Sequence, residues 1–312
     1  MGKTTDVFDQ LQHKGVSRRD FIKFSTLVAA ALGVAPAMIP QIAHAVTAKK
    51  KPPVIWLHLA ECTGCSEAVL RSTYPWIDTL ILDVLSVDYH ETIMAAAGLQ
   101  AEDNLYASMK ENKGNYICVV EGAIPTKNEG RYGLIGGRTM LELTKMVTAD
   151  ALATISLGTC ASFGGVQKAA PNPTGAMGVG EALGIKPINI AGCPPNPVNF
   201  VATVVHFLLL GKLPDLDEVG RPLFAYGQTI HDQCPRRAHF EEGNFVKVFG
   251  DAGTTNEWCL YEMGCRGPDT YNNCSKLLFN DGTSWPIGAG APCIGCSEPD
   301  FWDKMAPFFV AK

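Results

Sequence analysis

Short apolar runs alternate with longer amphipathic segments along the first two thirds of the chain. The apolar runs predict buried strands at residues 54–60, 80–87, 116–120, 152–157 and 188–191. Between them, residues 101–112, 138–149 and 196–210 have helical composition, and the last segment begins with Asn196-Pro197 and stops at Gly211. Buried strands that alternate with helices indicate an α/β fold with a doubly wound parallel sheet.

The pattern changes after Arg221, where glycines and short turns dominate and periodic segments become brief. This region is too irregular to bury much core of its own, so metal centres would supply its scaffold. We therefore expect two domains, one at residues 46–225 that contains the sheet and an irregular one at residues 226–312.

The N-terminus has the features of an export signal. Ser17-Arg18-Arg19-Asp20-Phe21 is a twin-arginine pattern, residues 27–39 form a mildly apolar stretch, and Ala43-His44-Ala45 is a cleavage site. A short membrane anchor is the alternative, but the apolar stretch is shorter than the ~20 residues that span a bilayer. We expect residues 1–45 to be a twin-arginine signal peptide that directs a folded, cofactor-loaded protein to the periplasm.

Composition narrows the classes of protein further. The chain has 312 residues, of which 46% are hydrophobic and 18% charged, and its formal net charge is −5. These values are typical of a globular protein, and without a basic stripe they give no support to nucleic-acid binding. The eleven cysteines are an odd number and none lies in the leader, which favours metal centres over a framework of disulfides.

Four cysteines follow predicted strands. Cys62 and Cys65 form a C-x-x-C pair after the first strand, Cys160 follows the strand at 152–157, and Cys193 follows the strand at 188–191. Ligands bind beyond the carboxyl ends of parallel strands, so these thiols should converge at one edge of the sheet. Four thiolates bind either zinc or a cubane cluster, and their wide spacing in the sequence favours the bulkier cluster.

The irregular region contains the other soft ligands. His231 and Cys234 form an H-x-x-C pair, Cys259 and Cys265 flank a short segment, Cys274 stands apart, and Cys293 and Cys296 form a second C-x-x-C pair. A histidine is usually an ordinary imidazole with a hydrogen-bonding partner, and we interpret His58, His90, His206 and His239 in that way. His231 differs because its spacing to Cys234 is that of a ligand pair.

These motifs together resemble the small, electron-transferring subunit of periplasmic nickel–iron hydrogenases. The resemblance covers nearly the whole chain and is carried by Glu-Cys-Thr-Gly-Cys-Ser-Glu at 61–67, Gly-Thr-Cys-Ala-Ser-Phe-Gly-Gly at 158–165, Gly-Cys-Pro-Pro-Asn-Pro at 192–197, Met-Gly-Cys-Arg-Gly-Pro at 263–268 and Pro-Cys-Ile-Gly-Cys at 292–296. It implies a flavodoxin-like domain, an irregular C-terminal domain, and three iron–sulfur clusters in a row.

The resemblance also implies which residues bind each cluster. Cys62, Cys65, Cys160 and Cys193 match the ligands of the proximal [4Fe–4S] cluster; His231, Cys234, Cys259 and Cys265 match those of the distal [4Fe–4S] cluster; Cys274, Cys293 and Cys296 match those of the medial cluster. Cys118 is left over and should be a buried apolar residue of a strand.

Three further positions refine the expected cluster types. Some oxygen-tolerant relatives have extra cysteines at the positions of Gly64 and Gly165, so two glycines here imply an ordinary proximal cubane. Selenium-containing relatives have a cysteine at the position of Pro286, so proline there implies a [3Fe–4S] medial cluster.

The resemblance implies which partners this chain has, and it indicates the small subunit rather than the large one. The nickel–iron site should lie on a large subunit that forms a heterodimer with this chain, and the electron acceptor should be a protein such as a multihaem cytochrome c. Cysteine pairs near both ends also occur in the large subunit, but the motifs around Cys160 and Cys193 belong to the small one. We expect no membrane span, because no apolar segment follows Phe308-Phe309-Val310 before Lys312.

Two other functions compete with this interpretation. An exported zinc- or disulfide-containing binding protein would be colourless and free of iron and sulfide. A flavin-binding protein would have a phosphate-binding loop of Ser, Thr and Gly where this chain has cysteines.

Overall fold

A computed structural model of the chain describes residues 18–39, 41–42, 51–72, 77, 80, 85–280 and 282–310. The predicted cleavage site at Ala43-His44-Ala45 lies outside these residues, as does Ser17 of the twin-arginine pattern.

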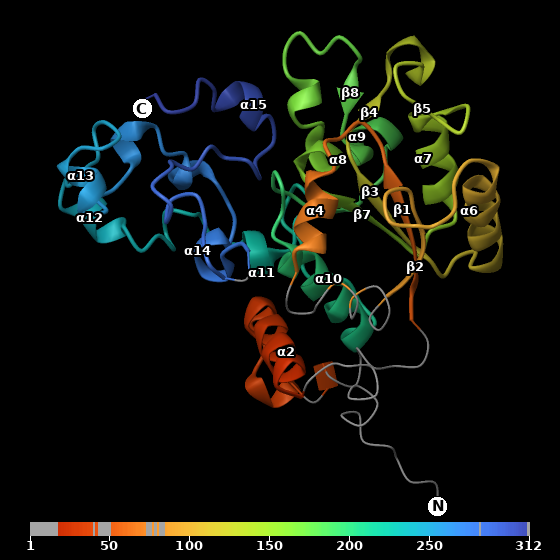
Figure 1. The fold of residues 1–312 in the computed structure, drawn as a ribbon, viewed down its shortest axis with the longest axis horizontal. Coiled ribbons are helices and arrows are strands. Elements are labelled where there is room, and N and C mark those ends of the chain that lie inside the picture. The colour runs from red at the N-terminus through yellow and green to blue at the C-terminus, as the bar shows by residue number, and fades with distance from the viewer. Residues whose placement is uncertain are drawn as a thin grey trace, which may run out of the picture.

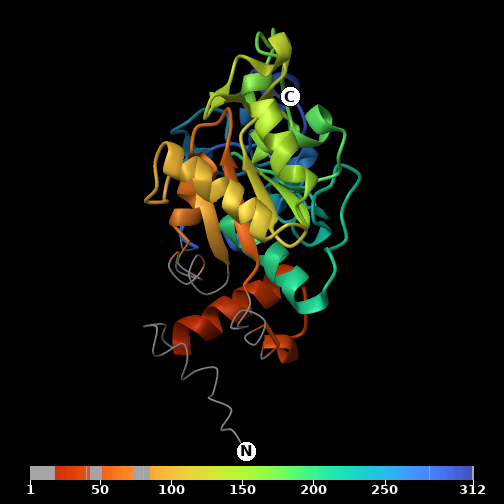
Figure 2. The ribbon, with the colours of Figure 1, turned by 90° about the vertical axis from the view of Figure 1, so that its right-hand side faces the viewer.

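A parallel sheet of five strands organises the first half of the molecule (Figures 1 and 2). Its strands are β1 (Pro53–His58), β2 (Ser86–His90), β3 (Ile117–Glu121), β7 (Ala153–Leu157) and β9 (Ile188–Ile190). They lie in the order β2-β1-β3-β7-β9, and every neighbouring pair is parallel. Renumbered within the sheet, this order is 2-1-3-4-5, which is the flavodoxin-like arrangement. The predicted α/β class and doubly wound parallel sheet are confirmed.

The second strand is the one that the sequence misplaced. The apolar segment at 80–87 predicts it, but β2 begins at Ser86 and continues to His90. Leu80 and Leu85 are fully buried ahead of the strand, while residues 81–84 lie outside the described part. Because β2 is an edge strand that pairs only with β1, it does not need the continuous apolar sequence of a central strand.

Six helices of the described residues accompany the sheet, and three of them lie near the predicted segments 101–112, 138–149 and 196–210, while the sequence did not predict the other three, at 64–70, 159–163 and 179–183. The six are α4 (Gly64–Leu70), α6 (Leu99–Glu111), α7 (Met140–Ala149), α8 (Thr159–Phe163), α9 (Val179–Leu183) and α10 (Pro197–Leu210). The side chain of Asn196 accepts a hydrogen bond from the Val198 backbone N–H at 3.0 Å, and Gly211 ends α10 with a φ of 63°. Asn196 is therefore an N-cap, and Gly211 supplies the left-handed residue that ends the helix.

Alternate residues of the strands build two separate cores. Val54 and Trp56 of β1 pack on the face covered by α10, while Ile55 and Leu57 pack on the face covered by α6 and α7. Both faces of the sheet are therefore apolar, as a parallel sheet requires. Cys118 of β3 is fully buried in the second core, which confirms the expectation for that residue.

Two short antiparallel ladders accompany the parallel sheet. β4 (Ile124–Pro125) pairs with β8 (Ala176–Met177), and β5 (Leu134–Ile135) pairs with β6 (Arg138–Thr139). The side chain and backbone of Thr139 exchange hydrogen bonds with Glu142 and cap α7.

The region after Tyr226 has a different construction. Its described helices are short: α12 (Arg237–Glu241), α13 (Ala252–Thr255), α14 (Cys274–Leu277) and α15 (Phe301–Lys304), preceded by α11 (Leu223–Tyr226) at the boundary. Its described residues form isolated bridges rather than a sheet. A small core of Ile230, Val246, Leu260, Trp285 and Ile287 packs directly against cysteines.

Part of the predicted signal peptide packs on the rest of the chain. The helix α2 (Arg18–Leu32) lies beside α10, and Val28 and Ala29 are buried there (Figure 1). A short 3-10 turn, η1 (Pro36–Met38), follows it. Among the described residues, no helix has the length and apolar character needed to cross a membrane.

Arg221 joins the two halves through a buried network of charges. Arg221 is 5% exposed, and its guanidinium donates to Asp217 at 2.7 Å, to Glu298 at 2.8 Å and to the Ser297 carbonyl at 2.9 Å. Glu298 also accepts a hydrogen bond from the Tyr271 backbone N–H at 2.7 Å. A buried cation with two carboxylate partners and a carbonyl is satisfied, so this contact fixes the irregular region against the sheet domain.

Candidate metal centres

The four thiols at the strand ends form one group, which we call the proximal group. Cys62 and Cys65 follow β1, Cys160 lies in α8 directly after β7, and Cys193 follows β9. Burial raises the pKa of Cys65 well above its ordinary value, and Glu121, Cys160, Cys193 and Cys62 raise it further through their charges. Such mutual effects require proximity, so the predicted convergence at one edge of the sheet is observed.

Glycines leave room around the sulfur atoms of the proximal group. A Cβ atom at Gly165 would lie 2.5 Å from Cys160 Sγ, and one at Gly64 would lie 3.2 Å from Cys62 Sγ. A Cβ atom at Gly158 would overlap Cys65 Sγ. Gly158 and Gly165 also have positive φ angles, 87° and 59°, which disfavour other residues. The chain therefore approaches the thiols too closely for side chains, as expected around a bulky inorganic centre.

Glu121 anchors the loop that contains Cys65. Its carboxylate accepts hydrogen bonds from the backbone N–H groups of Cys65 and Ser66, both at 3.1 Å. It also accepts from Ser66 Oγ at 2.6 Å and from Trp56 Nε1 at 3.2 Å. Four donors satisfy a buried carboxylate and fix the start of α4 against the end of β3.

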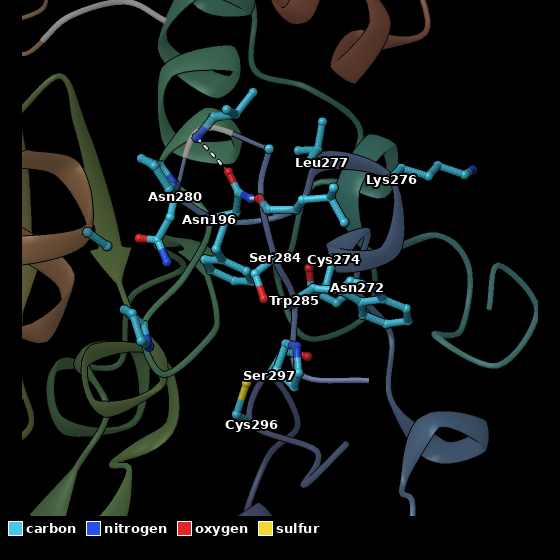
Figure 3. Close-up of a pocket in the computed structure, with 18 of the residues that line it drawn as sticks. Asn196, Asn272, Cys274, Lys276, Leu277, Asn280, Ser284, Trp285, Cys296 and Ser297 are labelled. Carbon is cyan, nitrogen blue, oxygen red and sulfur yellow. Dashed lines mark hydrogen bonds between the residues drawn. The ribbon is translucent and has the colours of Figure 1, made fainter. Parts of the chain in front are cut away.

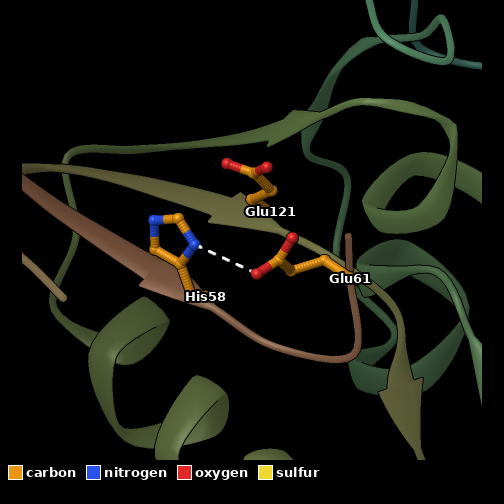
Figure 4. Close-up of side chains that lie close together, drawn as sticks. All are labelled: His58, Glu61 and Glu121. Atoms are coloured by element: carbon orange, nitrogen blue, oxygen red, sulfur yellow. Dashed lines mark hydrogen bonds and ion pairs between the residues drawn. The ribbon is translucent and has the colours of Figure 1, made fainter. Parts of the chain in front are cut away.

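A polar cluster that the sequence analysis missed surrounds this anchor (Figure 4). His58, Glu61 and Glu121 offer ligand atoms within 4.8 Å of one another, and His58 Nδ1 lies 3.3 Å from Glu61. Glu121 uses its oxygens on the four donors named above, so we assign it to loop positioning rather than to metal binding. The sequence signal was a carboxylate at the end of an otherwise apolar strand, since a charge placed there must have buried partners.

The other histidines were predicted to be ordinary imidazoles with hydrogen-bonding partners, and the structure shows such partners for only some of their ring nitrogens. His206 Nδ1 lies 3.1 Å from the Lys212 carbonyl oxygen, as predicted for a paired imidazole. His58 Nε2 and His90 Nε2 lie 3.5 Å apart, while the buried Nδ1 atoms of His90 and His239 have no hydrogen-bonding partner. Burial, followed by the charge of His58, lowers the pKa of His90 to about 4, so His90 is neutral at physiological pH.

A second group, the medial group, consists of Cys274, Cys293 and Cys296. Burial raises the pKa of Cys274, and the charges of Cys296 and Cys293 raise it further. All three thiols line a large open cavity that Pro286 also lines. Figure 3 shows Cys274, Cys296 and Trp285 among its lining residues. The three predicted thiols thus face one cavity, and Pro286 lines the same cavity.

The third group, the distal group, lies within the region after Tyr226. His231, Cys234, Cys259 and Cys265 together line a small cavity. Burial raises the pKa of Cys259, and Cys265 and Cys234 raise it further. The ring of His231 stacks edge-on against Phe240 with the ring centres 4.7 Å apart, which fixes its orientation. All four predicted residues are thus brought together.

The three groups adjoin one another in a definite order. Burial raises the pKa of Cys296 to about 11, and the charge of Cys193 in the proximal group contributes to that increase. Burial raises the pKa of Cys293 to about 12, with contributions from Cys296 and from Cys265 of the distal group. The contacts agree, because Cys193 and Cys296 line one cavity and the Arg266 N–H, next to Cys265, donates to the Cys293 carbonyl at 2.8 Å. The medial group therefore lies between the other two.

The chemistry of these groups fits iron–sulfur clusters. All eleven cysteines lie in described parts of the chain, and none is in a disulfide. Packing thiols so closely disfavours their thiolate forms, and bound iron would supply the compensating positive charge. Thiolates with one imidazole are ligands of iron–sulfur centres.

Ten soft ligands from cysteine and one from histidine, arranged in three adjoining groups on an α/β scaffold, define an electron-transfer protein of the iron–sulfur class. Residues 226–309 match the family described as the C-terminal part of the NiFe/NiFeSe hydrogenase small subunit, and residues 62–207 match the NADH ubiquinone oxidoreductase, 20 Kd subunit family. The chain belongs to the family of nickel–iron hydrogenase small subunits.

The similarity to relatives extends along nearly the whole chain. The periplasmic [NiFe] hydrogenase small subunit of Solidesulfovibrio fructosivorans is 56% identical over 304 residues, which span 97% of this chain and 96% of that protein. The periplasmic [NiFe] hydrogenase small subunit 1 of Nitratidesulfovibrio vulgaris is 53% identical over 304 residues, spanning 96% and 95%.

A solved structure shows the same fold. The [NiFeSe]-hydrogenase of Dm. baculatum matches with a TM-score of 0.79 and 39% identity, covering 84% of this chain and 100% of that chain. The chain is thus the electron-relaying part of a hydrogenase, and the nickel–iron site lies on the large subunit. The predicted hydrogenase function is confirmed, and nothing favours a zinc- or disulfide-containing binding protein.

Proposed function

We propose that this chain relays electrons from a hydrogen-splitting large subunit through three clusters to an external acceptor. The proximal and distal groups would each bind a [4Fe–4S] cluster, and the medial group a [3Fe–4S] cluster. The observation that carries the proposal is the order of the groups. The Thr159 hydroxyl, next to Cys160, donates to the Cys296 carbonyl, and the Arg266 N–H, next to Cys265, donates to the Cys293 carbonyl. Each cluster would then have a neighbour to which it passes one electron at a time.

The entry point would be the proximal group. Cys62 and Cys193 are exposed, although thiolate ligands of a cluster are normally sheltered. A cavity of about 1350 Å³ that Cys193 and Gly64 line is far larger than a cluster. We infer that the surface with Cys62 and Cys193 is covered by the large subunit in an extensive, obligate interface, which would bring its nickel site near the proximal cluster.

The exit point would be the distal group. An imidazole ligand carries no negative charge, so His231 would make the distal cluster less negative and tend to raise its reduction potential. This suits the last site before an acceptor. With a net charge of −5 the chain favours a cationic acceptor, for which a multihaem cytochrome c is our proposal.

Pro286 supports the assignment of three irons to the medial cluster. It lines the cavity with Cys274, Cys293 and Cys296, and it has neither a thiol nor an N–H group. With three thiolates and a proline ring, the fourth corner of a cubane would lack its ligand. The glycines at 64 and 165 support an ordinary cubane in the proximal group, because both positions are in contact with its sulfur atoms.

Export by the twin-arginine route completes the proposal. The two relatives from Solidesulfovibrio and Nitratidesulfovibrio are periplasmic, and Arg18 begins α2 in a chain that starts with an export pattern. Replacing both Arg18 and Arg19 with lysine should leave the heterodimer in the cytoplasm. A periplasmic heterodimer in that variant would contradict the export route.

Replacing one distal ligand tests the relay directly. Cys234→Ser should abolish most dye-linked hydrogen oxidation, because electrons can no longer leave through the distal cluster. Hydrogen–deuterium exchange between gas and water needs only the nickel site, so it should persist. Cys118→Ala is the control, since Cys118 is buried in the sheet core outside the three groups. Equal loss of both activities in Cys234→Ser would contradict the assignment.

A further inference from the structure

The hydroxyl group of Thr159 connects the proximal and medial groups. Thr159 is the first residue of α8, directly before Cys160, and its side chain is 1% exposed. Its Oγ1 donates a hydrogen bond to the Cys296 backbone carbonyl at 2.5 Å. One buried atom therefore links a residue next to a proximal ligand with the main chain of a medial ligand.

The same hydroxyl also contacts the segment before Cys193. The Gly192 backbone N–H donates to Thr159 Oγ1 at 2.9 Å, and the Thr159 N–H donates to the Gly192 carbonyl at 2.9 Å. Because Gly192 uses a lone pair of the hydroxyl, the single hydroxyl proton remains available for the Cys296 carbonyl. The direction of both bonds is thereby fixed.

The geometry points to Thr159 as a positioning residue for electron transfer between the proximal and medial clusters. This inference rests on the proposed function. The β-branched side chain restricts the Thr159 rotamer, so its hydroxyl holds the Cys293–Cys296 loop at a fixed place relative to the ends of β7 and β9. An apolar residue between these groups would leave the Gly192 N–H and the Cys296 carbonyl without these partners in a buried place.

Electron transfer is sensitive to such positioning. The rate of tunnelling falls exponentially with the gap between two centres, and less steeply through bonded and hydrogen-bonded atoms than across a void. The proximal thiols would hold the electron donor and the medial thiols the acceptor, so each event would move one electron from the first group to the second. Hydrogen oxidation on the large subunit supplies the electrons, and Thr159 keeps its proton and its oxidation state.

Two substitutions separate the hydroxyl from the shape of the side chain. Thr159→Val keeps the branched shape and removes the hydroxyl, while Thr159→Ser keeps the hydroxyl. Thr203→Val is the matched control, because Thr203 is equally buried and its hydroxyl donates to the Asn199 carbonyl within α10 at 2.8 Å. All variants are made in the complete heterodimer.

Three measurements on each variant test the inference. They are iron and sulfide content, the magnetic interaction between the proximal and medial clusters by electron paramagnetic resonance, and the ratio of dye-linked hydrogen oxidation to isotope exchange. Thr159→Val should lower that ratio several-fold and alter the magnetic interaction, or lose medial iron selectively. Thr159→Ser and Thr203→Val should match the wild type in all three.

Each other result overturns the inference. It fails if Thr159→Val matches the wild type in all three measurements, and it fails if Thr159→Ser shares the defect of Thr159→Val. Loss of proximal iron alone would assign the hydroxyl to the proximal group only. A wild type without iron–sulfur clusters would instead refute the proposed function, so the two failures are distinguishable.

Discussion

The sheet domain and the region after Tyr226 hold their metal ligands by different means. In the first, backbone hydrogen bonds between parallel strands fix the positions of Cys62, Cys160 and Cys193 before any metal binds. In the second, short helices and isolated bridges surround a small core that packs directly on cysteines. A ligand set at the end of a sheet is preorganised by the fold, whereas a ligand set on loops must be organised by its metal.

Iron removal should produce the largest difference in stability between the two regions. If iron is removed from the heterodimer with a chelator, the amides of residues 226–310 should lose nearly all protection against hydrogen exchange. Amides of β1, β3 and β7 should keep theirs, because their ladder bonds and apolar cores do not involve metal. Mass spectrometry of the exchanged protein measures both regions together. If the amides of the sheet lost their protection to the same extent, the sheet would not be preorganised independently of the metal.

Adding one methyl group beside a sulfur should damage the preorganised site. In Gly165→Ala, the new Cβ would lie 2.5 Å from Cys160 Sγ, so the proximal cluster should be lost or incompletely formed. Gly211→Ala is the control, since Gly211 has a similar φ of 63° but no atom within 4 Å of the added Cβ. The control should cost only the strain of a left-handed residue, about 1–2 kcal/mol. Iron analysis and thermal unfolding distinguish the two variants.

A new thiol in the loop-based medial group should change the cluster it binds. Pro286→Cys would supply a fourth thiolate beside Cys274, Cys293 and Cys296, so a [3Fe–4S] centre should become [4Fe–4S]. The three-iron signal in electron paramagnetic resonance should vanish while iron content rises. Pro286→Ser removes the ring without adding a thiol and should keep the signal. A wild type that lacks the signal would exclude a three-iron medial cluster.

The smallest expected effect is a pH dependence in the sheet domain. Burial raises the pKa of Glu91 to about 7, although its carboxylate accepts a hydrogen bond from the His58 N–H at 2.7 Å. The folded state therefore binds more protons than the unfolded state between pH 4.5 and 7, so stability falls as pH rises through that window. The cost above it amounts to at most ~3 kcal/mol.

Replacing the carboxyl group should remove this dependence. Glu91→Gln keeps an oxygen for the His58 N–H and cannot ionise, so its melting temperature should exceed that of the wild type at pH 8 but not at pH 5. An equal difference at both pH values would mean that ionisation of Glu91 is not responsible.

The same contrast explains what the sequence could predict. Continuous apolar runs located β1, β3, β7 and β9, and the rule that ligands gather at the carboxyl ends of strands placed the proximal group. The edge strand β2 was misplaced because polar and apolar residues are mixed in it, whereas the apolar residues Leu80 and Leu85 lie ahead of it. The ligands of the medial and distal groups do not follow strands of a sheet, so no rule of this kind applies to them. Only the resemblance to a family could assign them to groups. The positioning roles of Glu121 and Thr159 depend on contacts between distant segments that no local pattern encodes.

The buried contact of Arg221 with Glu298 limits how this protein can be divided. The two residues come from opposite sides of the boundary expected near residue 225, and both lie in the interior. A fragment that begins at residue 226 would retain Glu298 and the Tyr271 N–H but lose the cation that balances the carboxylate. A shortened fragment designed to keep only the medial and distal groups must therefore include residues 217–221. Otherwise Glu298 must be replaced by an uncharged residue.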